Sequence, residues 1–435
     1  MRWPRAAPRR ALVEESLERV AREPRAFSAV QDSAARAAAD AQDALRRAGR
    51  AGRYAGIPVT VKDLFDQAGL VTRAGSVALD NAAPASADAP VVARLQAAGF
   101  VILGRTNMVE FAFSGLGVNP HLGTPTSPWD RATGRLPGGS SSGAAVAAAD
   151  GMGFGGLGSD TGGSCRIPAA LCGVVGYKPT AARVPLAGAL PLSFSLDSVG
   201  PIARSVACCR ALDGVIADAP AMHAPLELAG LRLAVLRNYV EEGMEDAVAR
   251  PYQAALARLS AAGARLIDLR LPEIEELPAI NATGGFAASE AWAWHRPLIE
   301  RAAALYDPRI LARIKRGERM TAENYITLLQ ARRGMIERVA ARLAGFDAVL
   351  MPTVPLAPPA VAAVAEEREY NRINMLLLRN TSIANFLDGC SISLPCHAAG
   401  EAPAGLMLMA MGGADARLFA MAEAVERLVS PSYPV

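Results

Sequence analysis

Lysine is scarce in this chain of 435 residues. Lys62, Lys178 and Lys315 are the only three lysines among 45 basic residues, so arginine supplies positive charge almost everywhere. Arginine keeps its proton near neutral pH, whereas a lysine removed from water can release its proton. This scarcity makes each lysine a residue whose presence has to be explained.

Histidine and cysteine are also rare, and neither is arranged as a familiar site. The four histidines are scattered along the chain, at His121, His223, His295 and His397. The sequence by itself therefore proposes no Ser-His-Asp triad, although one could assemble in space. The six cysteines are too few and too irregularly spaced for a disulfide framework or a zinc site, and stand at Cys165, Cys172, Cys208, Cys209, Cys390 and Cys396. We expect no metal, no cofactor and a reducing cytoplasm.

Long apolar runs and a strong net charge are absent as well. No stretch of 18 uncharged apolar residues exists, and the arginine-rich start, 1–10, is followed by Glu14 and Glu15, which makes it a poor secretory signal. The formal net charge is only +3, too small to suggest nucleic acid or an anionic membrane as a partner. A small-molecule substrate is the better expectation.

Small residues, by contrast, are concentrated in two segments between positions 136 and 180. The first, 138–143, reads Gly-Gly-Ser-Ser-Ser-Gly and leads into the apolar, helix-like 144–149. The second, 158–164, reads Gly-Ser-Asp-Thr-Gly-Gly-Ser, where small residues let backbone N–H groups turn inward to hold an anion or an oxyanion. Ser140 and Ser164 are therefore expected in loops whose backbone can approach a ligand closely.

Predicted strands and helices alternate along most of the chain. Strands are expected at 27–30, 56–65, 100–103, 231–236, 266–271, 347–351, 391–394 and 404–409, with helices between them. This alternation predicts an α/β fold: a single large domain whose mixed, twisted central β-sheet is covered by helices on both faces.

Lys62 falls near the end of the predicted strand 56–65, which is apolar enough to be buried. A buried lysine there could act as a general base. The plainer interpretation is a strand-end lysine paired with Asp63 or Asp66, and position alone favours this alternative. The two serine segments reverse that preference, because they supply groups with which a neutral amine could exchange protons.

The glycine-rich segments allow two other interpretations. Residues 139–143 match G-x-S-x-G, the nucleophile elbow of α/β-hydrolases, with Ser141 at the centre, but 133–137 does not have the character of the strand that an elbow requires. Glycine-rich loops also bind phosphates, but no G-x-x-x-x-G-K-[ST] motif is present. The elbow leaves the second segment unexplained, and no lysine lies between Lys62 and Lys178 to support a nucleotide role.

The two serine segments together with Lys62 resemble the amidase signature family of Ser-Ser-Lys amide hydrolases. The resemblance is strong over a signature core at about 54–180, and 78 residues separate Lys62 from Ser140, with 24 more to Ser164. The C-terminal half, about 205–435, would then shape the substrate pocket. Ser142, where many members have glycine, and Cys165, where an aliphatic residue is usual, depart from the pattern and bear on substrate preference.

The resemblance implies a mechanism and a set of site residues. Ser164 would attack the amide carbonyl while Ser140, preceded by a cis peptide bond, passes its proton to Lys62. The oxyanion would be held by the backbone N–H groups of four residues: Thr161, Gly162, Gly163 and Ser164. Three further residues match family positions that brace these loops: Ser141, Asp160 and Arg166. Lys178 also matches a family motif, and we interpret it as structural.

Function within this fold has two alternatives to a stand-alone amidase. The A subunit of a tRNA-dependent amidotransferase resembles the chain in the signature, but it uses a carboxylate about two turns before an asparagine like Asn385, and 373–386 contains neither Asp nor Glu. A non-catalytic binding protein on the same fold is the other. Arg379 is either a scaffold residue, exposed or paired with Asp388, or a ligand for an acidic substrate group. A homodimer is left open.

Overall fold

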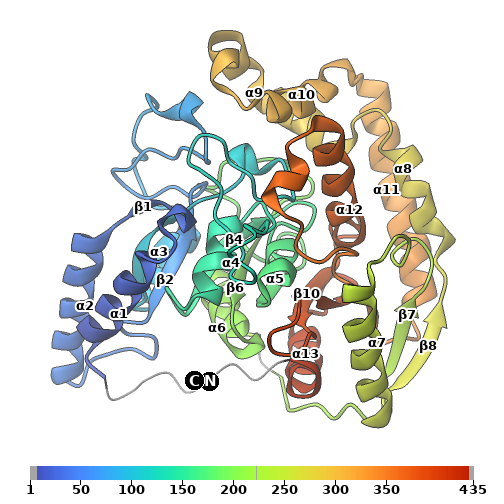
Figure 1. Cartoon of the computed structure of the whole chain (residues 1–435), viewed down its shortest axis with the longest axis horizontal. Coiled ribbons are helices and arrows are strands. Elements are labelled where there is room, and N and C mark those ends of the chain that lie inside the picture. Colours follow the sequence, from blue (N-terminus) through green and yellow to red (C-terminus); the bar gives the residue numbers. More distant parts are fainter. Residues whose placement is uncertain (1–6, 222, 431–435) are drawn as a thin grey trace.

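Eleven strands in the described residues, 7–221 and 223–430 of a computed structural model, form one mixed sheet (Figure 1). Their order is β1-β3-β2-β4-β6-β5-β10-β11-β9-β7-β8. Strand β2 is parallel to β3 and β4, β7 is parallel to β8 and β9, and the other pairs are antiparallel. The strands are β1 (Phe27–Val30), β2 (Pro58–Lys62), β3 (Val101–Thr106), β4 (Gly155–Asp160), β5 (Val175–Lys178), β6 (Ser198–Ala203), β7 (Arg232–Leu236), β8 (Arg265–Leu269), β9 (Ala348–Pro352), β10 (Cys390–Pro395) and β11 (Gly405–Ala410).

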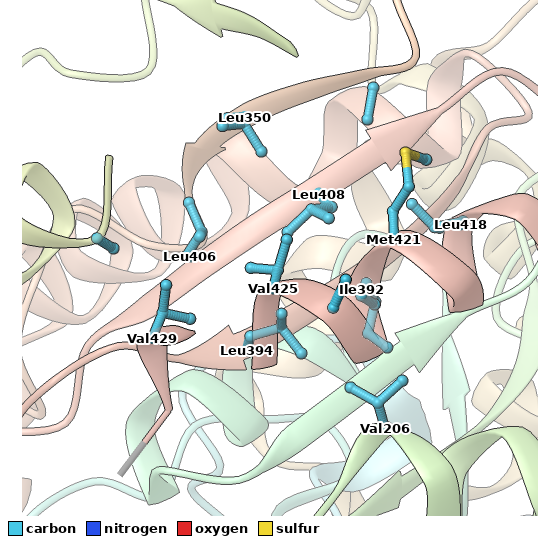
Figure 2. Packing of buried hydrophobic residues seen from close by; sticks show 14 of the residues in the cluster. Val206, Leu350, Ile392, Leu394, Leu406, Leu408, Leu418, Met421, Val425 and Val429 are labelled. Atoms are coloured by element: carbon cyan, nitrogen blue, oxygen red, sulfur yellow. The ribbon is translucent and has the colours of Figure 1, made fainter. Parts of the chain in front are cut away.

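Helices cover both faces of this sheet, which confirms the predicted α/β class. Along β10 and β11 alternate side chains leave the sheet on opposite sides, and Leu406 and Leu408 meet the C-terminal helix α13 in one cluster, part of which Figure 2 shows. Met407 and Met409 belong to another cluster, on α11 and α12. The helices are α1 (Arg9–Val20), α2 (Asp32–Arg47), α3 (Pro90–Ala97), α4 (Ser142–Ala149), α5 (Arg166–Cys172), α6 (Val206–Ile216), α7 (Asp246–Ala261), α8 (Leu277–Ile280), α9 (Gly285–Ala302), α10 (Pro308–Lys315), α11 (Ala322–Leu343), α12 (Glu367–Phe386) and α13 (Asp415–Val429).

Strand β4 corrects an expectation from the sequence. The segment from Gly158 to Asp160 was expected in a loop, but it forms the end of this fully buried strand, which lies between β2 and β6. A Cβ at Gly156 would lie 3.1 Å from the Cβ of Ala144, and one at Gly158 would lie 2.9 Å from the Ser141 hydroxyl. Glycine is needed here because α4 and its N-terminal residues approach the strand closely, and its low strand propensity hid the strand.

Strands β5 and β6 were not predicted either, although they connect the two halves of the sheet. No helix in the described parts of the chain combines the length and the apolar character that crossing a membrane requires.

Candidate active site

Lys62 is the last residue of β2 and is completely buried. Its Nζ lies 2.8 Å from Ser140 Oγ and 2.8 Å from Ser159 Oγ. Burial lowers the pKa of Lys62 to about 8, although the nearby Asp160 and Asp197 charges oppose the shift. Lys62 thus combines a lowered pKa with two hydroxyl neighbours.

The alternative ion pairs of Lys62 do not form among the described residues. Asp63 is bound by Arg105 at 2.7 Å, and Asp66 accepts a hydrogen bond from the Thr72 hydroxyl at 2.5 Å. The ammonium group is therefore buried without a carboxylate against it, so its neutral form is comparatively favourable.

Ser140 lies between a cis peptide bond, Gly139–Ser140, and the start of α4. The next residue, Ser141, ties this segment to the second serine segment: its N–H donates to the Ser164 carbonyl at 3.2 Å, and its hydroxyl donates to the Ser159 carbonyl at 3.2 Å. Ser140 and Ser159 thus lie against Lys62 at the end of β2, and the Ser164 carbonyl is bound to the residue that follows Ser140. Ser159 was missed as a site residue because its segment was interpreted as a loop, where the direction of its side chain cannot be inferred.

Residues 161–165 connect β4 to α5, and this turn is held by Asp160, the residue directly before it. The Asp160 carboxylate accepts the N–H of Gly163 at 2.8 Å and that of Cys165 at 3.0 Å, and it forms a completely buried ion pair with Arg166 at 2.8 Å. Burial alone would raise the pKa of Asp160, but the charge and hydrogen bonds of Arg166 hold it far below its usual value. The carboxylate therefore stays ionised and keeps the turn closed.

Helix α12 supplies the rest of this support. Arg166 donates to the Thr381 carbonyl at 2.8 Å and to Asn385 Oδ1 at 2.7 Å, while Asn385 Nδ2 donates to Asp160 Oδ1 at 2.9 Å. The Thr381 hydroxyl donates to the Gly162 carbonyl at 2.6 Å. The supporting roles of Thr381 and Asn385 were not found from the sequence, because they lie more than 200 positions away and carry no local motif.

The four backbone N–H groups expected to face an oxyanion are not equivalent. That of Gly163 is already donated to Asp160. Those of Thr161, Gly162 and Ser164 donate to no acceptor within the parts of the chain that the structure describes, and neither does the Ser164 hydroxyl. Three donors and one hydroxyl are thus available at one turn.

The nucleophile-elbow alternative is not supported by this geometry. An elbow needs a strand leading into its serine, but the residues before Gly138 make only an isolated bridge between Arg135 and Ala360. Lys178, in turn, is buried with its Nζ donating at 2.7 Å to the carbonyls of Pro179 and Gly389, which fits the structural role expected for it.

Arg379 lies on α12, two residues before Thr381. It is half-buried and donates to the Val240 carbonyl at 3.0 Å and to Asn380 Oδ1 at 3.1 Å. The suggested partner Asp388 is bound by Arg332 instead. Two of the five guanidinium N–H groups are thus used by these neighbours.

Among residues 7–221 and 223–430, no three His, Cys, Asp or Glu side chains are grouped so that they could hold a metal ion.

A buried lysine, paired serine segments and a turn rich in free N–H groups fit a hydrolase of amide C–N bonds. The Amidase family model matches residues 11–419, and the chain belongs to this family. Membership in a family of enzymes argues against the non-catalytic alternative.

Individual relatives cover nearly the whole chain. It is 38% identical to the 2-amino-5-chloromuconic acid deaminase of Comamonas testosteroni, over 97% of this chain and 93% of that protein. It is 33% identical to the A subunit of the glutamyl-tRNA(Gln) amidotransferase of Salinispora arenicola, over 94% and 91%. The crystal structure of an amidase, 30% identical, superposes with a TM-score of 0.89 over 98% of this chain and 97% of that one.

Proposed function

We propose that this enzyme hydrolyses a carboxylic acid amide to the acid and ammonia or an amine through an acyl-enzyme on Ser164. The observation that carries the proposal is the contact of a buried lysine, free of carboxylate partners, with Ser140 and Ser159 at 2.8 Å each. With a pKa of about 8, a useful fraction of Lys62 is neutral near physiological pH, so it can accept a proton.

The reaction proceeds in two halves. Ser164 Oγ attacks the amide carbonyl carbon and gives its proton to Ser140, which passes its own proton to Lys62. The N–H groups of Thr161, Gly162 and Ser164 receive the oxyanion, each worth roughly 3 kcal/mol in comparable sites. The proton on Lys62 returns through Ser140 to the departing nitrogen, the C–N bond breaks, and water then hydrolyses the ester by the same relay.

A fluorophosphonate probe tests the nucleophile directly. We expect labelling of the purified enzyme, mapped by peptide mass spectrometry to Ser164, and loss of labelling in Ser164→Ala. Ser141→Ala is the matched control and should still be labelled. Labelling at Ser141 or no labelling at all would contradict the proposed acyl-enzyme.

Glutamine hydrolysis is the second candidate, because the chain is 33% identical to the A subunit of an amidotransferase. The position two turns before Asn385, where those proteins are expected to carry a carboxylate, is Leu378. Its Cδ2 lies 3.3 Å from where a Cβ at Gly162 would stand, so an apolar side chain borders the turn 161–165. A glutamine ammonium group would find no counter-charge there, and this disfavours the glutaminase.

The substrate can be sought by an ammonia-release screen. It should include aliphatic, aryl and carboxylate-bearing amides, ureas, glutamine and 2-amino-5-chloromuconic acid, the compound in the name of the Comamonas testosteroni relative. Preference for glutamine would favour the second candidate over the first.

Cytoplasmic location and a homodimer remain predictions, and the six free, buried cysteines support a reducing compartment.

A further inference from the structure

A second carboxylate, half-buried, contacts the start of the turn 161–165. Asp197 directly precedes β6, and Ser198 is paired with Asp160 across the sheet, so Asp197 lies beside Thr161. Its Oδ1 accepts the Thr161 hydroxyl at 2.5 Å. Its Oδ2 accepts the N–H groups of Leu192 at 2.9 Å and Ser193 at 3.1 Å. Asp197 therefore joins the start of the turn to the loop 192–197.

The loop 192–197 is itself held on its far side by Glu290 of α9. Glu290 Oε2 accepts the Ser193 hydroxyl at 2.5 Å and the Ser195 N–H at 3.0 Å. The loop is thus hydrogen-bonded to two carboxylates, Asp197 and Glu290. These bonds hold Asp197 in place while it accepts the hydrogen bond from Thr161.

Two charged groups on other elements interact with Asp197. Lys62 at the end of β2 is stabilised in its protonated form by the Asp197 charge, and the Glu290 charge disfavours ionisation of Asp197. No arginine or lysine forms an ion pair with Asp197 within the described parts of the chain. Burial raises the pKa of Asp197 to about 6, and the carboxylate is held by hydrogen bonds alone. A carboxylate that lacks a cationic partner and has a raised pKa is a candidate for a functional role.

We propose that Asp197 is a positioning residue of the amidase site: it fixes Thr161 through the side chain, and so directs the N–H groups of Thr161, Gly162 and Ser164 toward the oxyanion. The proposal rests on the proposed function and deepens it. Asp160 fixes the end of the turn through Gly163 and Cys165, and Asp197 fixes its beginning. Between the two carboxylates the remaining N–H groups are left free.

Its charge gives Asp197 an effect that a purely structural residue would not have. Because an anion near Lys62 favours the ammonium form, removing it should lower the pKa of Lys62 and move the rising limb of the pH profile of kcat/KM to lower pH. Removing only the Thr161 hydroxyl should leave this limb where it is. Position and charge can therefore be separated by mutation.

The test compares Asp197→Asn, Thr161→Val and Thr161→Ser on the full chain, with any substrate from the screen. We expect Asp197→Asn and Thr161→Val to lower kcat by about 10 to 100-fold with KM changed less than about threefold, because a misplaced donor acts mainly on the transition state. Thr161→Ser should restore most of kcat. Only Asp197→Asn should move the pH limb downward.

Asp213→Asn is the matched control. Asp213 on α6 is a buried carboxylate whose pKa is likewise raised by burial to about 6, but it pairs with Arg183 outside the site. Its variant should keep the wild-type kcat and pH profile, even if its melting temperature falls.

The outcomes distinguish failure of the positioning role from failure of the proposed function. Wild-type kcat and an unmoved pH limb in Asp197→Asn would overturn the positioning role. If Asp197→Asn does not fold, Thr161→Val with wild-type kcat, or Thr161→Ser without recovery, overturns it instead. Ser164→Ala and Lys62→Arg are measured beside them: full activity in these two would refute the proposed function itself, whatever Asp197 does.

Discussion

Replacing Lys62 by methionine should abolish turnover and also change how stability depends on pH. Burial lowers the pKa of Lys62 from 10.5 to about 8, which corresponds to about 3 kcal/mol against the protonated form in the folded protein. Methionine keeps most of the side-chain length without the amine. The change therefore removes the buried charge together with the proposed catalytic base.

The direction in which stability changes with pH follows from the number of protons that the folded and unfolded chains bind. The unfolded chain keeps the Lys62 proton up to about pH 10.5, whereas the folded chain loses it above about pH 8. Wild-type stability therefore rises between these values relative to a chain without this group, and the cost is fully present below pH 8. The stability of Lys62→Met minus that of the wild type should fall by about 2 to 3 kcal/mol between pH 7 and pH 10. Lost hydrogen bonds to the serines shift the difference by a nearly constant amount.

Urea unfolding of both proteins at pH 7, 8.5 and 10 measures this difference, and the exposed Lys315→Met is the control expected to show no such trend. Lys62→Arg completes the set: it keeps the charge, cannot give up its proton and should lower turnover by several orders of magnitude. A stability difference that stays constant with pH, or near-normal turnover in Lys62→Arg, would refute the neutral-lysine argument.

The remaining predictions concern the same site. In the wild type, kcat/KM should rise about tenfold per pH unit up to about pH 8 as Lys62 becomes neutral, and a flat profile below pH 8 in steady-state assays would contradict this. Ser164→Ala should abolish acylation in single-turnover assays, while Ser140→Ala should keep slow activity because water can replace the relay; reversed effects would mean that the nucleophile is wrongly assigned. Asp160→Asn should destabilise the protein by about 3 to 5 kcal/mol in urea unfolding, since it leaves a buried guanidinium without its partner, and a loss below about 1 kcal/mol would show that the pair is not needed. Arg379→Ala should raise KM by about 10 to 100-fold for carboxylate-bearing amides only; equal weakening of all substrates would make it a scaffold residue.

The sequence predicted the outer parts of the fold better than its centre. Strands β7 to β11 were found because apolar residues alternate with turn signals. Strand β4 was missed because three of its six residues are glycine, a residue with low strand propensity. The close approach of α4 and α6 leaves little room for larger side chains at these positions. Long-range packing, which a single sequence does not display, determines that this segment forms a strand.

In the candidate site, too, some residues could be identified from the sequence and others could not. Lys62 and the serine segments could be picked out because their residue types are unusual for their surroundings, and the resemblance supplied their roles. Ser159, Thr381, Asn385 and Asp197 could not, because ordinary polar residues gain importance only from what the fold brings beside them. Gly163 was expected to keep its N–H free, and only the structure reveals that Asp160 uses it.

The distance along the chain between Asp160 and Asn385 has a consequence for the order in which the enzyme becomes active during synthesis. The hydrogen bond between them closes a separation of 225 residues, whereas Lys62 and Ser140 are 78 residues apart. A nascent chain can therefore bring Lys62 and Ser140 together long before α12 has left the ribosome, but it cannot complete the support of the turn 161–165. Acquisition of activity should thus coincide with the docking of α12, which makes turnover a reporter for one of the last long-range contacts to form.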